Sequence, residues 1–484
     1  MERKSFYMEK KKLKLFSALA ILALALLVVG ATYAYFQNQY GSASNVDVKV
    51  TTYTTDALTF ETGDAINISA DQDTFAQGKG NQTGSTFAKA TLQANNKTNT
   101  ATANYYMYLN IETNTFTYTN TGTPELILQV VDKTSGNPVT SITSLDYVTV
   151  TDGKNTSISG FDITNKDGLI ALFSNKEISA SPKTIEEYTI TITLVNHSFD
   201  QNNNTGKNLS GKLIIQKEKM ITSISDVAKN GDNLVTAIQN LSTKSKPSYT
   251  RLYHHDATLA NGAGDNSYRF AGASADVKNY ICLGSSETTC PDDNLYRIIG
   301  VFGDNNHGLT GQQLVKVIKN TSIGNLFWND GELNSTFKTE KLSGFEDKIA
   351  NVTWRVSEYG SSEVTAKTVY TAEITNVTKT YTAQIGLMYP SDYGYATAQD
   401  YWTTNLYDYG TAARNKDWLF LGKWEWLLFR YSDNSKFAWC VYGNGDVYYN
   451  RTNGTNATRP SFYLLSSVNY VSGDGSKNSP IRVN

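Results

Sequence analysis

Residues 188–194 read Tyr-Thr-Ile-Thr-Ile-Thr-Leu, in which larger hydrophobic side chains alternate with threonines. Because successive side chains of a β-strand point to opposite faces, this period of two predicts a strand with one buried face. Residues 105–111 repeat the alternation, and residues 126–131 and 213–215 are further short apolar runs. Turn-forming sequences such as residues 135–138 (Ser-Gly-Asn-Pro) separate the runs, so the pattern predicts several antiparallel strands.

No helical pattern interrupts these runs, and residues 37–218 are therefore predicted to form an antiparallel β-sandwich. The composition agrees, since Thr and Tyr favour strands while Asn and Gly favour turns, and we expect a mostly β protein.

A chain of 484 residues exceeds what one core normally holds, which predicts at least two domains. The net charge of -2 provides no basic field, so nucleic acid is excluded as a partner.

The N-terminus combines a basic flank with an apolar segment. Six Lys and Arg residues lie in residues 1–14, and residues 15–36 carry no charge. Such a segment is long enough to cross a bilayer with its basic flank in the cytoplasm, which makes the membrane a partner through residues 15–36. The small residues before Tyr35 also suit a signal peptidase, with cleavage after Ala34. A retained anchor and a cleaved signal remain alternatives, and both place the rest of the chain outside the cell.

Residues 219–248 are predicted to be a linker with a short helix, because Leu234, Val235, Ile238 and Leu241 have helical spacing. This helix either separates two domains or packs onto one of them. The last region, residues 249–484, contains short apolar runs between Gly- and Asn-rich turns, and we expect a compact α+β domain.

Three cysteines occur in this last region. Cys282 and Cys290 enclose a polar loop, and outside the cell such a pair is expected to form a disulfide. A zinc site would need four ligands and finds two, so we predict no metal and no cofactor. Cys440 is expected to be a buried, unreactive thiol, since no histidine is nearby in the sequence.

Two segments of the C-terminal third combine aromatic, amide and hydroxyl side chains on predicted loops, residues 431–435 and 448–456. Tyrosine supplies contact area at a low entropic cost, and Asn and Ser adapt their hydrogen bonds, so such loops bind sugars or proteins. Ordinary solvated loops are the alternative. The predicted ligand-binding residues are Tyr431, Asp433, Asn434, Trp439, Tyr448, Asn450, Arg451, Asn453 and Asn456.

The segment Gly-Ala-Thr-Tyr-Ala-Tyr-Phe at residues 30–36, followed by the alternating strands, resembles the camelysin and TasA family of Gram-positive surface and biofilm-matrix proteins. The resemblance implies a jelly-roll-like sandwich and, in some members, polymerisation by strand donation. The chain contains no His-Glu-x-x-His motif, so protease activity is not carried over.

The region from about residue 250 to 484 resembles an uncharacterised C-terminal domain of surface proteins from gut-type Gram-positive bacteria. Its pattern is also similar to the formylglycine-generating-enzyme branch of the C-type lectin fold, whose enzymes use two cysteines where this chain has only Cys440. The matching segments are residues 268–273 (Tyr-Arg-Phe-Ala-Gly-Ala), 280–282, 290–302, 385–396 (Ile-Gly-Leu-Met-Tyr-Pro-Ser-Asp-Tyr-Gly-Tyr-Ala), 459–464 and 473–476.

Three functions are therefore expected in order of preference. The first is a cell-surface adhesin or ligand-binding protein, anchored or secreted, with the sandwich as a stalk and a glycan or protein as ligand. The second is a matrix protein that self-associates through the sandwich. The third is an enzyme acting on wall or glycan material, for which no convincing catalytic set exists. Its candidate carboxylates are Asp292, Asp293, Glu425 and Asp433.

Overall fold

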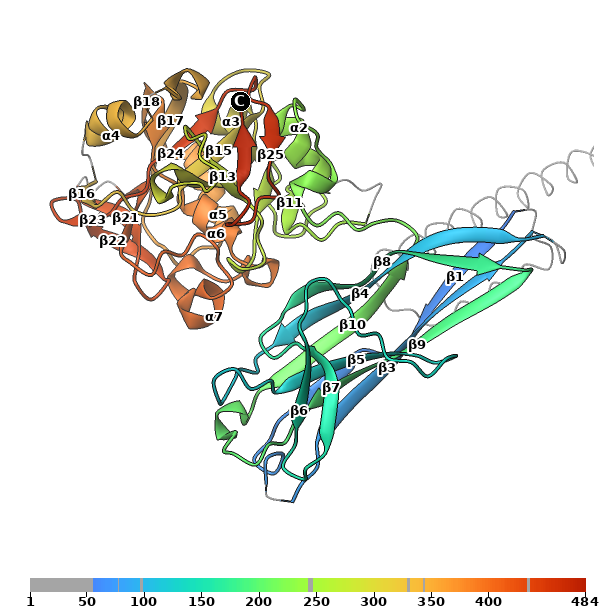
Figure 1. Cartoon of the computed structure of the whole chain (residues 1–484). Helices are drawn as coiled ribbons and strands as arrows, with labels where there is room; N and C mark the ends of the chain where they lie inside the picture. The colour runs from blue at the N-terminus through green and yellow to red at the C-terminus, as the bar shows by residue number, and fades with distance from the viewer. Residues whose placement is uncertain are drawn as a thin grey trace, which may run out of the picture. The chain divides into compact units, whose positions relative to one another are not determined.

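The computed structural model describes residues 55–76, 78–95, 99–242, 247–328, 331–342, 344–432 and 436–484. Strands account for 41% of the residues and helices for 15%, which confirms the prediction of a mostly β protein. The chain divides into two compact units between Lys219 and Met220 (Figure 1). The predicted membrane or signal segment, with its cleavage site at Ala34 and Tyr35, lies outside the described residues. Among the described residues, no helix combines the length and apolar character needed to cross a membrane.

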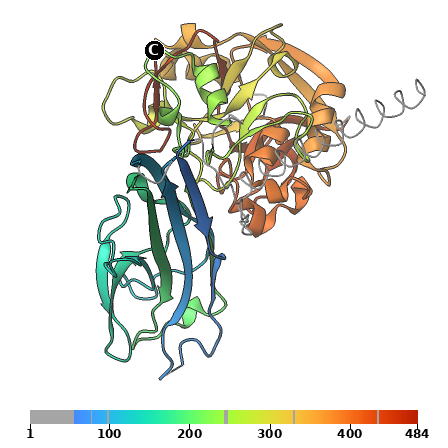
Figure 2. The same ribbon diagram turned by 90° about the vertical axis from the view of Figure 1, so that its right-hand side faces the viewer.

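Two antiparallel sheets form the first unit, and their strands run side by side along it (Figures 1 and 2). One sheet has the order β1-β3-β9-β5-β7-β6 and the other the order β2-β10-β4-β8. The four segments predicted to be strands fall in β9, β4, β5 and β10, so these predictions are confirmed. The strands are β1 (Ala57–Thr62), β2 (Ile66–Ser69), β3 (Gln82–Gln93), β4 (Ala101–Asn114), β5 (Leu126–Asp132), β6 (Tyr147–Thr151), β7 (Ser157–Asp162), β8 (Gly168–Ala180), β9 (Lys183–Leu194) and β10 (Asn208–Gln216), with a 3-10 turn η1 (Asn202–Asn204) before β10.

The alternation in β9 explains how the two sheets hold together. Ile190 and Ile192 are completely buried in a core that draws side chains from both sheets. On the opposite face of the same strand, the Thr191 hydroxyl lies 2.9 Å from that of Ser85 on the neighbouring strand β3. Opposite Ile192 stands Gly84, where an added Cβ would lie 2.6 Å from Cγ2 of Ile66 on the other sheet. Glycine therefore permits the close approach of the two sheets at this position.

The second unit also contains two sheets. One has the order β19-β24-β15-β14-β13-β26-β25, with β12 paired to β14 and β11 to β12; the other has the order β16-β23-β20-β17-β18, with β21 paired to β20 and β22 to β21. Their strands are β11 (Leu252–His254), β12 (Tyr268–Phe270), β13 (Tyr280–Cys282), β14 (Leu295–Phe302), β15 (Leu314–Lys319), β16 (Asn325–Phe327), β17 (Val352–Tyr359), β18 (Val377–Ala383), β19 (Ile385–Gly386), β20 (Glu425–Tyr431), β21 (Phe437–Val441), β22 (Val447–Arg451), β23 (Thr455–Ala457), β24 (Ser461–Leu464), β25 (Tyr470–Ser472) and β26 (Ile481–Val483).

Short helices accompany these sheets, and one of them begins the unit. Leu234, Val235 and Ile238 of α2 are buried in the core of the second unit, together with Ile221 and Ile224. The predicted linker of residues 219–248 thus contributes a packed helix to this core. The helices are α2 (Leu234–Gln239), α3 (Asp304–His307), α4 (Thr336–Lys341), α5 (Ala366–Thr375), α6 (Pro390–Ala396) and α7 (Gly410–Arg414), and the 3-10 turns are η2 (Ile224–Asp226), η3 (Asn240–Ser242), η4 (Asp292–Asn294), η5 (Gly331–Asn334), η6 (Glu346–Lys348), η7 (Gln399–Tyr401) and η8 (Leu406–Asp408).

We expect Ile192→Ala to lower the unfolding free energy of the first unit by about 2 to 5 kcal/mol, because it leaves a cavity between the sheets. All seven tryptophans lie between residues 328 and 439, so tryptophan fluorescence reports on the second unit. Urea unfolding followed by far-ultraviolet circular dichroism should show an earlier transition, while the fluorescence transition stays in place. Thr191→Ala on the same strand is the control and should cost about 1 kcal/mol. A loss equal to that of the control would contradict the assignment of Ile192 to the core.

Candidate binding surface

The hairpin formed by β21 and β22 carries four of the predicted binding residues, Trp439, Tyr448, Asn450 and Arg451. Its outer strand β22 pairs only with β21 and is therefore an end strand of the sheet. In the connecting turn, the Tyr442 N–H donates to the Asp446 carbonyl at 2.8 Å, and Gly445 takes a φ of 100° that suits glycine. The Asp446 carboxylate accepts the Gly410 N–H at 2.7 Å, which fixes the turn against the start of α7.

Seven aromatic rings form a continuous chain of contacts around this hairpin, which we call the aromatic surface. The Trp424 and Tyr442 rings stack with centroids 4.1 Å apart, and Tyr442 meets Tyr448 at 5.9 Å. The Tyr448 ring in turn lies 4.1 Å from that of Tyr449. The members of the aromatic surface are Tyr407, Trp424, Tyr431, Phe437, Tyr442, Tyr448 and Tyr449.

Two rings of the aromatic surface are open to solvent. Trp424 is 46% exposed and Tyr407 is 41% exposed, whereas the other five rings are partly buried. The Trp424 indole lies almost parallel to the Tyr442 ring, at an angle of 10°, so one indole face is covered while the side chain remains open. Its backbone carbonyl accepts the Ala457 N–H at 2.8 Å, which holds the residue beside β23. The exposed indole is therefore positioned by both its ring and its backbone.

Hydrogen bonds between the tyrosines fix the inner rings. The Tyr442 hydroxyl donates to the Tyr449 carbonyl at 3.0 Å, and the Tyr448 hydroxyl donates to the Tyr449 hydroxyl at 3.1 Å. Burial raises the pKa of Tyr442 to about 12, so this phenol stays neutral under physiological conditions. A preorganised and uncharged surface loses little side-chain entropy when a ligand binds.

The structure brings some of the predicted binding residues together and separates others. Tyr431 and Tyr448 belong to the aromatic surface, and Asn450, Arg451 and Asn453 follow them as partly or fully exposed residues. Asp433 and Asn434 lie outside the described residues.

Trp439 and Asn456, in contrast, are buried. Trp439 is 1% exposed and packs edge-on against Phe429, so it belongs to the core and not to the binding surface. Asn456 is 5% exposed and accepts a hydrogen bond from Asn450 at 3.3 Å. All five residues of β21 are apolar and the last four are buried, so residue 439 belongs to a core strand.

Sequence reasoning missed Trp424, Tyr407 and Tyr442. Trp424 lies just before β20, whereas Trp426 lies within it and is buried. The position of the strand end therefore decides which of the two tryptophans is exposed. A tryptophan next to Gly422 and Lys423, outside an apolar run, is the one sequence signal that points to exposure.

The carboxylates considered for catalysis lie in different environments. Glu425 is 1% exposed, and Arg459 donates to both of its oxygens, at 2.6 and 2.8 Å. Asp293 pairs at the surface with Lys341 at 3.1 Å, while the neighbouring Asp292 accepts from Lys319 through its backbone carbonyl at 3.0 Å. Asp433 lies outside the described residues. Glu425 is thus engaged in a buried ion pair, whereas Asp292 and Asp293 are exposed.

The histidines of the second unit are also occupied by packing. His254 stacks on Tyr268 with centroids 4.2 Å apart, and the ring of the buried His255 accepts the Ala263 N–H at 3.0 Å. In the part of the chain that the structure describes, no three His, Cys, Asp or Glu side chains gather as a metal site.

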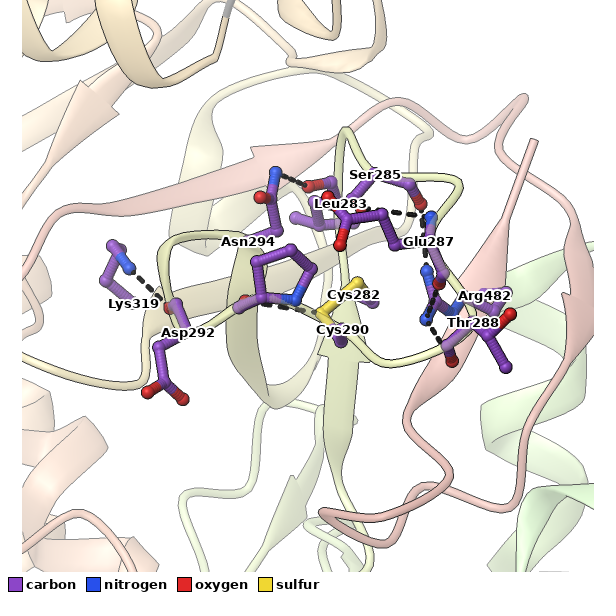
Figure 3. Close-up of a disulfide and its surroundings, with 11 residues drawn as sticks. Cys282, Leu283, Ser285, Glu287, Thr288, Cys290, Asp292, Asn294, Lys319 and Arg482 are labelled. Carbon is purple, nitrogen blue, oxygen red and sulfur yellow. Dashed lines mark hydrogen bonds between the residues drawn. A yellow bond between two sulfur atoms is a disulfide. The ribbon is translucent and has the colours of Figure 1, made fainter.

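Cys282 and Cys290 form the predicted disulfide, which is confirmed (Figure 3). Strand β26 pairs in parallel with β13, which places Arg482 opposite Cys282. The Arg482 guanidinium donates to the backbone carbonyls of Ser285, Glu287 and Thr288. The loop is therefore closed covalently and braced from the C-terminal strand, as the close-up shows (Figure 3). Cys440 is buried, as predicted, and burial raises the pKa of its thiol.

A buried ionic cluster lies apart from the disulfide loop. The Lys316 ammonium donates to the Asp392 carboxylate at 2.5 Å, with both side chains nearly inaccessible. The carboxyl of the nearby Glu373 accepts the N–H and hydroxyl of Ser391 at 2.8 and 2.6 Å. Burial raises the pKa of Glu373 to about 8, with the Asp392 charge adding to the effect. Since the side chains are enclosed, the cluster holds α5, α6 and β15 together and offers no open site.

Glu373 generates a testable pH dependence. Its pKa rises from 4.5 in an unfolded chain to about 8 in the fold, so folding favours the protonated form. Its contribution to stability is full below about pH 4.5 and is lost as the pH rises to 8. Glu373→Gln keeps the hydrogen-bonding shape without the charge, and its melting temperature relative to the unmodified chain should increase across this window. Melting temperatures are measured by tryptophan fluorescence at several pH values. A difference between the two proteins that stays constant from pH 4.5 to 8 would contradict the assignment.

Comparisons with protein-family models, curated proteins and solved structures found no match to this chain. The geometry and chemistry of the described side chains are therefore the basis for assigning a function.

Proposed function

We propose that this protein is an extracellular ligand-binding protein of the adhesin type, whose second unit binds its ligand through the aromatic surface. The observation that carries this proposal is the contiguous set of seven rings with Trp424 and Tyr407 open to solvent. Tryptophan and tyrosine dominate the binding energy of known interfaces, because they bury large area with few torsions to freeze. Exposed aromatic groups that gather in one place, and are fixed there by hydrogen bonds, are characteristic of interaction sites.

An extracellular location is supported by the disulfide and by the apolar N-terminal segment. Disulfides persist in oxidising compartments, and the loop between Cys282 and Cys290 depends on one. The uncharged residues 15–36 behind a basic flank suit export, as a retained anchor or as a cleaved signal.

The first unit suits the role of a stalk in this proposal. One of its sheets has the order β2-β10-β4-β8, and the other contains the order β3-β9-β5-β7. The chain thus passes repeatedly from one sheet to the other, in an order that supports the jelly-roll topology implied by the camelysin and TasA resemblance. For the second unit, the lone and buried Cys440 favours a C-type-lectin-like binding scaffold over oxidase chemistry.

A second candidate function is self-association of the sandwich into a matrix. The observation that favours it is β6, which ends the six-stranded sheet, pairs only with β7 and carries Tyr147 at 38% exposure. An end strand offers unpaired backbone groups to a strand of another molecule.

Sedimentation velocity of the full chain at high concentration tests this second candidate. Assembly through β6 predicts oligomers that Tyr147→Lys disperses, since a lysine on an end strand opposes strand addition. A chain that stays monomeric, or oligomers unaffected by the substitution, would eliminate strand pairing at β6.

Binding through the aromatic surface is tested with the full chain on arrays of extracellular proteins and glycans. Tyr448 contacts Tyr407, Tyr442 and Tyr449, so Tyr448→Ala should abolish the strongest binding signal. Phe327→Ala is the matched control, because Phe327 is a 48% exposed aromatic residue on β16 outside the aromatic surface, and this variant should bind normally. Retention of every signal by Tyr448→Ala, with the fold intact by circular dichroism, would refute the proposed site.

A further inference from the structure

We propose that the ligand of the aromatic surface is a neutral polysaccharide, whose pyranose rings stack on the exposed rings of Trp424 and Tyr407. This inference rests on the proposed function and names the chemical class of its ligand. It is carried by the geometry of the exposed indole, by the chemistry of the groups around it and by the extent of the ring chain.

The Trp424 indole is held flat against a neighbouring ring and remains widely accessible. Tyr442 lies parallel to Trp424 at 4.1 Å and covers one face, while nearly half of the Trp424 side chain remains accessible. The face of an aromatic ring is its electron-rich side and attracts groups with a positive edge. The axial C–H groups of a pyranose ring provide a flat surface of this kind, without the charge that an ammonium group brings.

The groups around the rings suit hydroxyls more than charges. The Tyr442 and Tyr448 hydroxyls are neutral donors and acceptors that already belong to a hydrogen-bonded set. Asn444 in the turn between β21 and β22 and Asn453 after β22 are exposed amides. Amides and phenols donate and accept at the same time, which matches the hydroxyl groups of a sugar.

Charges of both signs lie beside the two exposed rings. Lys423 precedes Trp424 and Asp408 follows Tyr407 in the sequence, and both charged residues are exposed. The Asp446 carboxylate accepts hydrogen bonds from the Gly410 N–H and the Asn444 amide, at 2.7 and 2.5 Å. The Arg451 guanidinium lies 5.8 Å from the centre of the Phe437 ring. A ligand with strong charge of one sign would therefore meet a like charge beside one of the two exposed rings, whereas a neutral chain would not.

The extent of the aromatic surface suits a polymer. Successive ring contacts of 4.1, 5.9, 4.1 and 5.3 Å connect Trp424 through Tyr442, Tyr448 and Tyr449 to Phe437. A single sugar covers only part of such a chain of rings. Several linked sugars can reach both exposed rings, Trp424 and Tyr407, which are connected through Tyr442 and Tyr448. Tethered contacts of this kind strengthen one another through a high effective concentration.

Affinity electrophoresis of the full chain tests the ligand class. The gels contain soluble neutral polysaccharides with glucan, xylan, mannan or galactan backbones, and a parallel gel contains anionic polygalacturonate. We expect at least one neutral polymer to retard the protein and polygalacturonate to leave it unretarded. Trp424→Ala should lower the association constant obtained from the retardation by about tenfold, as expected for a central aromatic contact. Trp424→Phe, which keeps a ring, should retain part of the binding, and Phe327→Ala should bind as the unmodified chain does.

Tryptophan fluorescence provides an independent readout. Trp424 is 46% exposed, whereas Trp354, Trp402, Trp418, Trp426 and Trp439 are at most 4% exposed. The polymer that retards the chain should therefore shift its emission to shorter wavelength, and Trp424→Phe should remove most of this shift. The change requires ligand at the indole itself, so it separates direct contact from an indirect effect of the substitution on folding.

The outcomes separate this inference from the proposed function. Protein ligands that require Tyr448, with no retardation by any neutral polymer, would overturn the polysaccharide ligand and leave the binding surface standing. Retardation that Trp424→Ala leaves unchanged would overturn the stacking site. If neither arrays nor gels show binding, both proposals fail.

Discussion

Burial on both faces of β14 and β15 is the constraint on which the second unit depends. Every residue of these two strands is buried, including Arg297, Lys316 and Lys319. Charged groups without water need partners inside the protein, because an unpaired buried charge is strongly destabilising. Lys316 finds the Asp392 carboxylate, and Arg297 donates to the Asn279 side chain at 2.6 Å. The central strands therefore determine where α6 and the loop before β13 must lie.

The aromatic surface is a consequence of where this core ends. β20 runs from the buried Glu425 to the partly exposed Tyr431, and the β21–β22 hairpin extends its sheet to an end strand. At this margin the tyrosines cover one another instead of entering the core, and their hydroxyls bond within the set. The exposure of Trp424 is thus tolerated because Tyr442 covers one face of the indole.

The sequence predicts local features well and the binding surface only in part. The alternation in residues 188–194 predicts β9 because a period of two is a local property, and the eight-residue spacing of Cys282 and Cys290 predicts their disulfide for the same reason. The contact between Tyr407 and Tyr448 joins η8 to β22, and no local pattern indicates it. Trp439 is among the predicted binding residues although it lies in the apolar run 437–441, and the structure buries it in strand β21. Residues that meet through tertiary packing are the ones that composition does not identify.

Indole NMR signals offer the most direct test of the claim that Trp424 is a preorganised ligand contact. With tryptophan labelled by ¹⁵N, the full chain should give one indole N–H signal per tryptophan, and Trp424→Phe assigns the signal of residue 424. Titration with the neutral polysaccharide that retards the chain most should shift this signal first, with the buried indoles nearly unchanged. An unchanged Trp424 signal at saturating polymer, or equal shifts of all the indoles, would contradict the account.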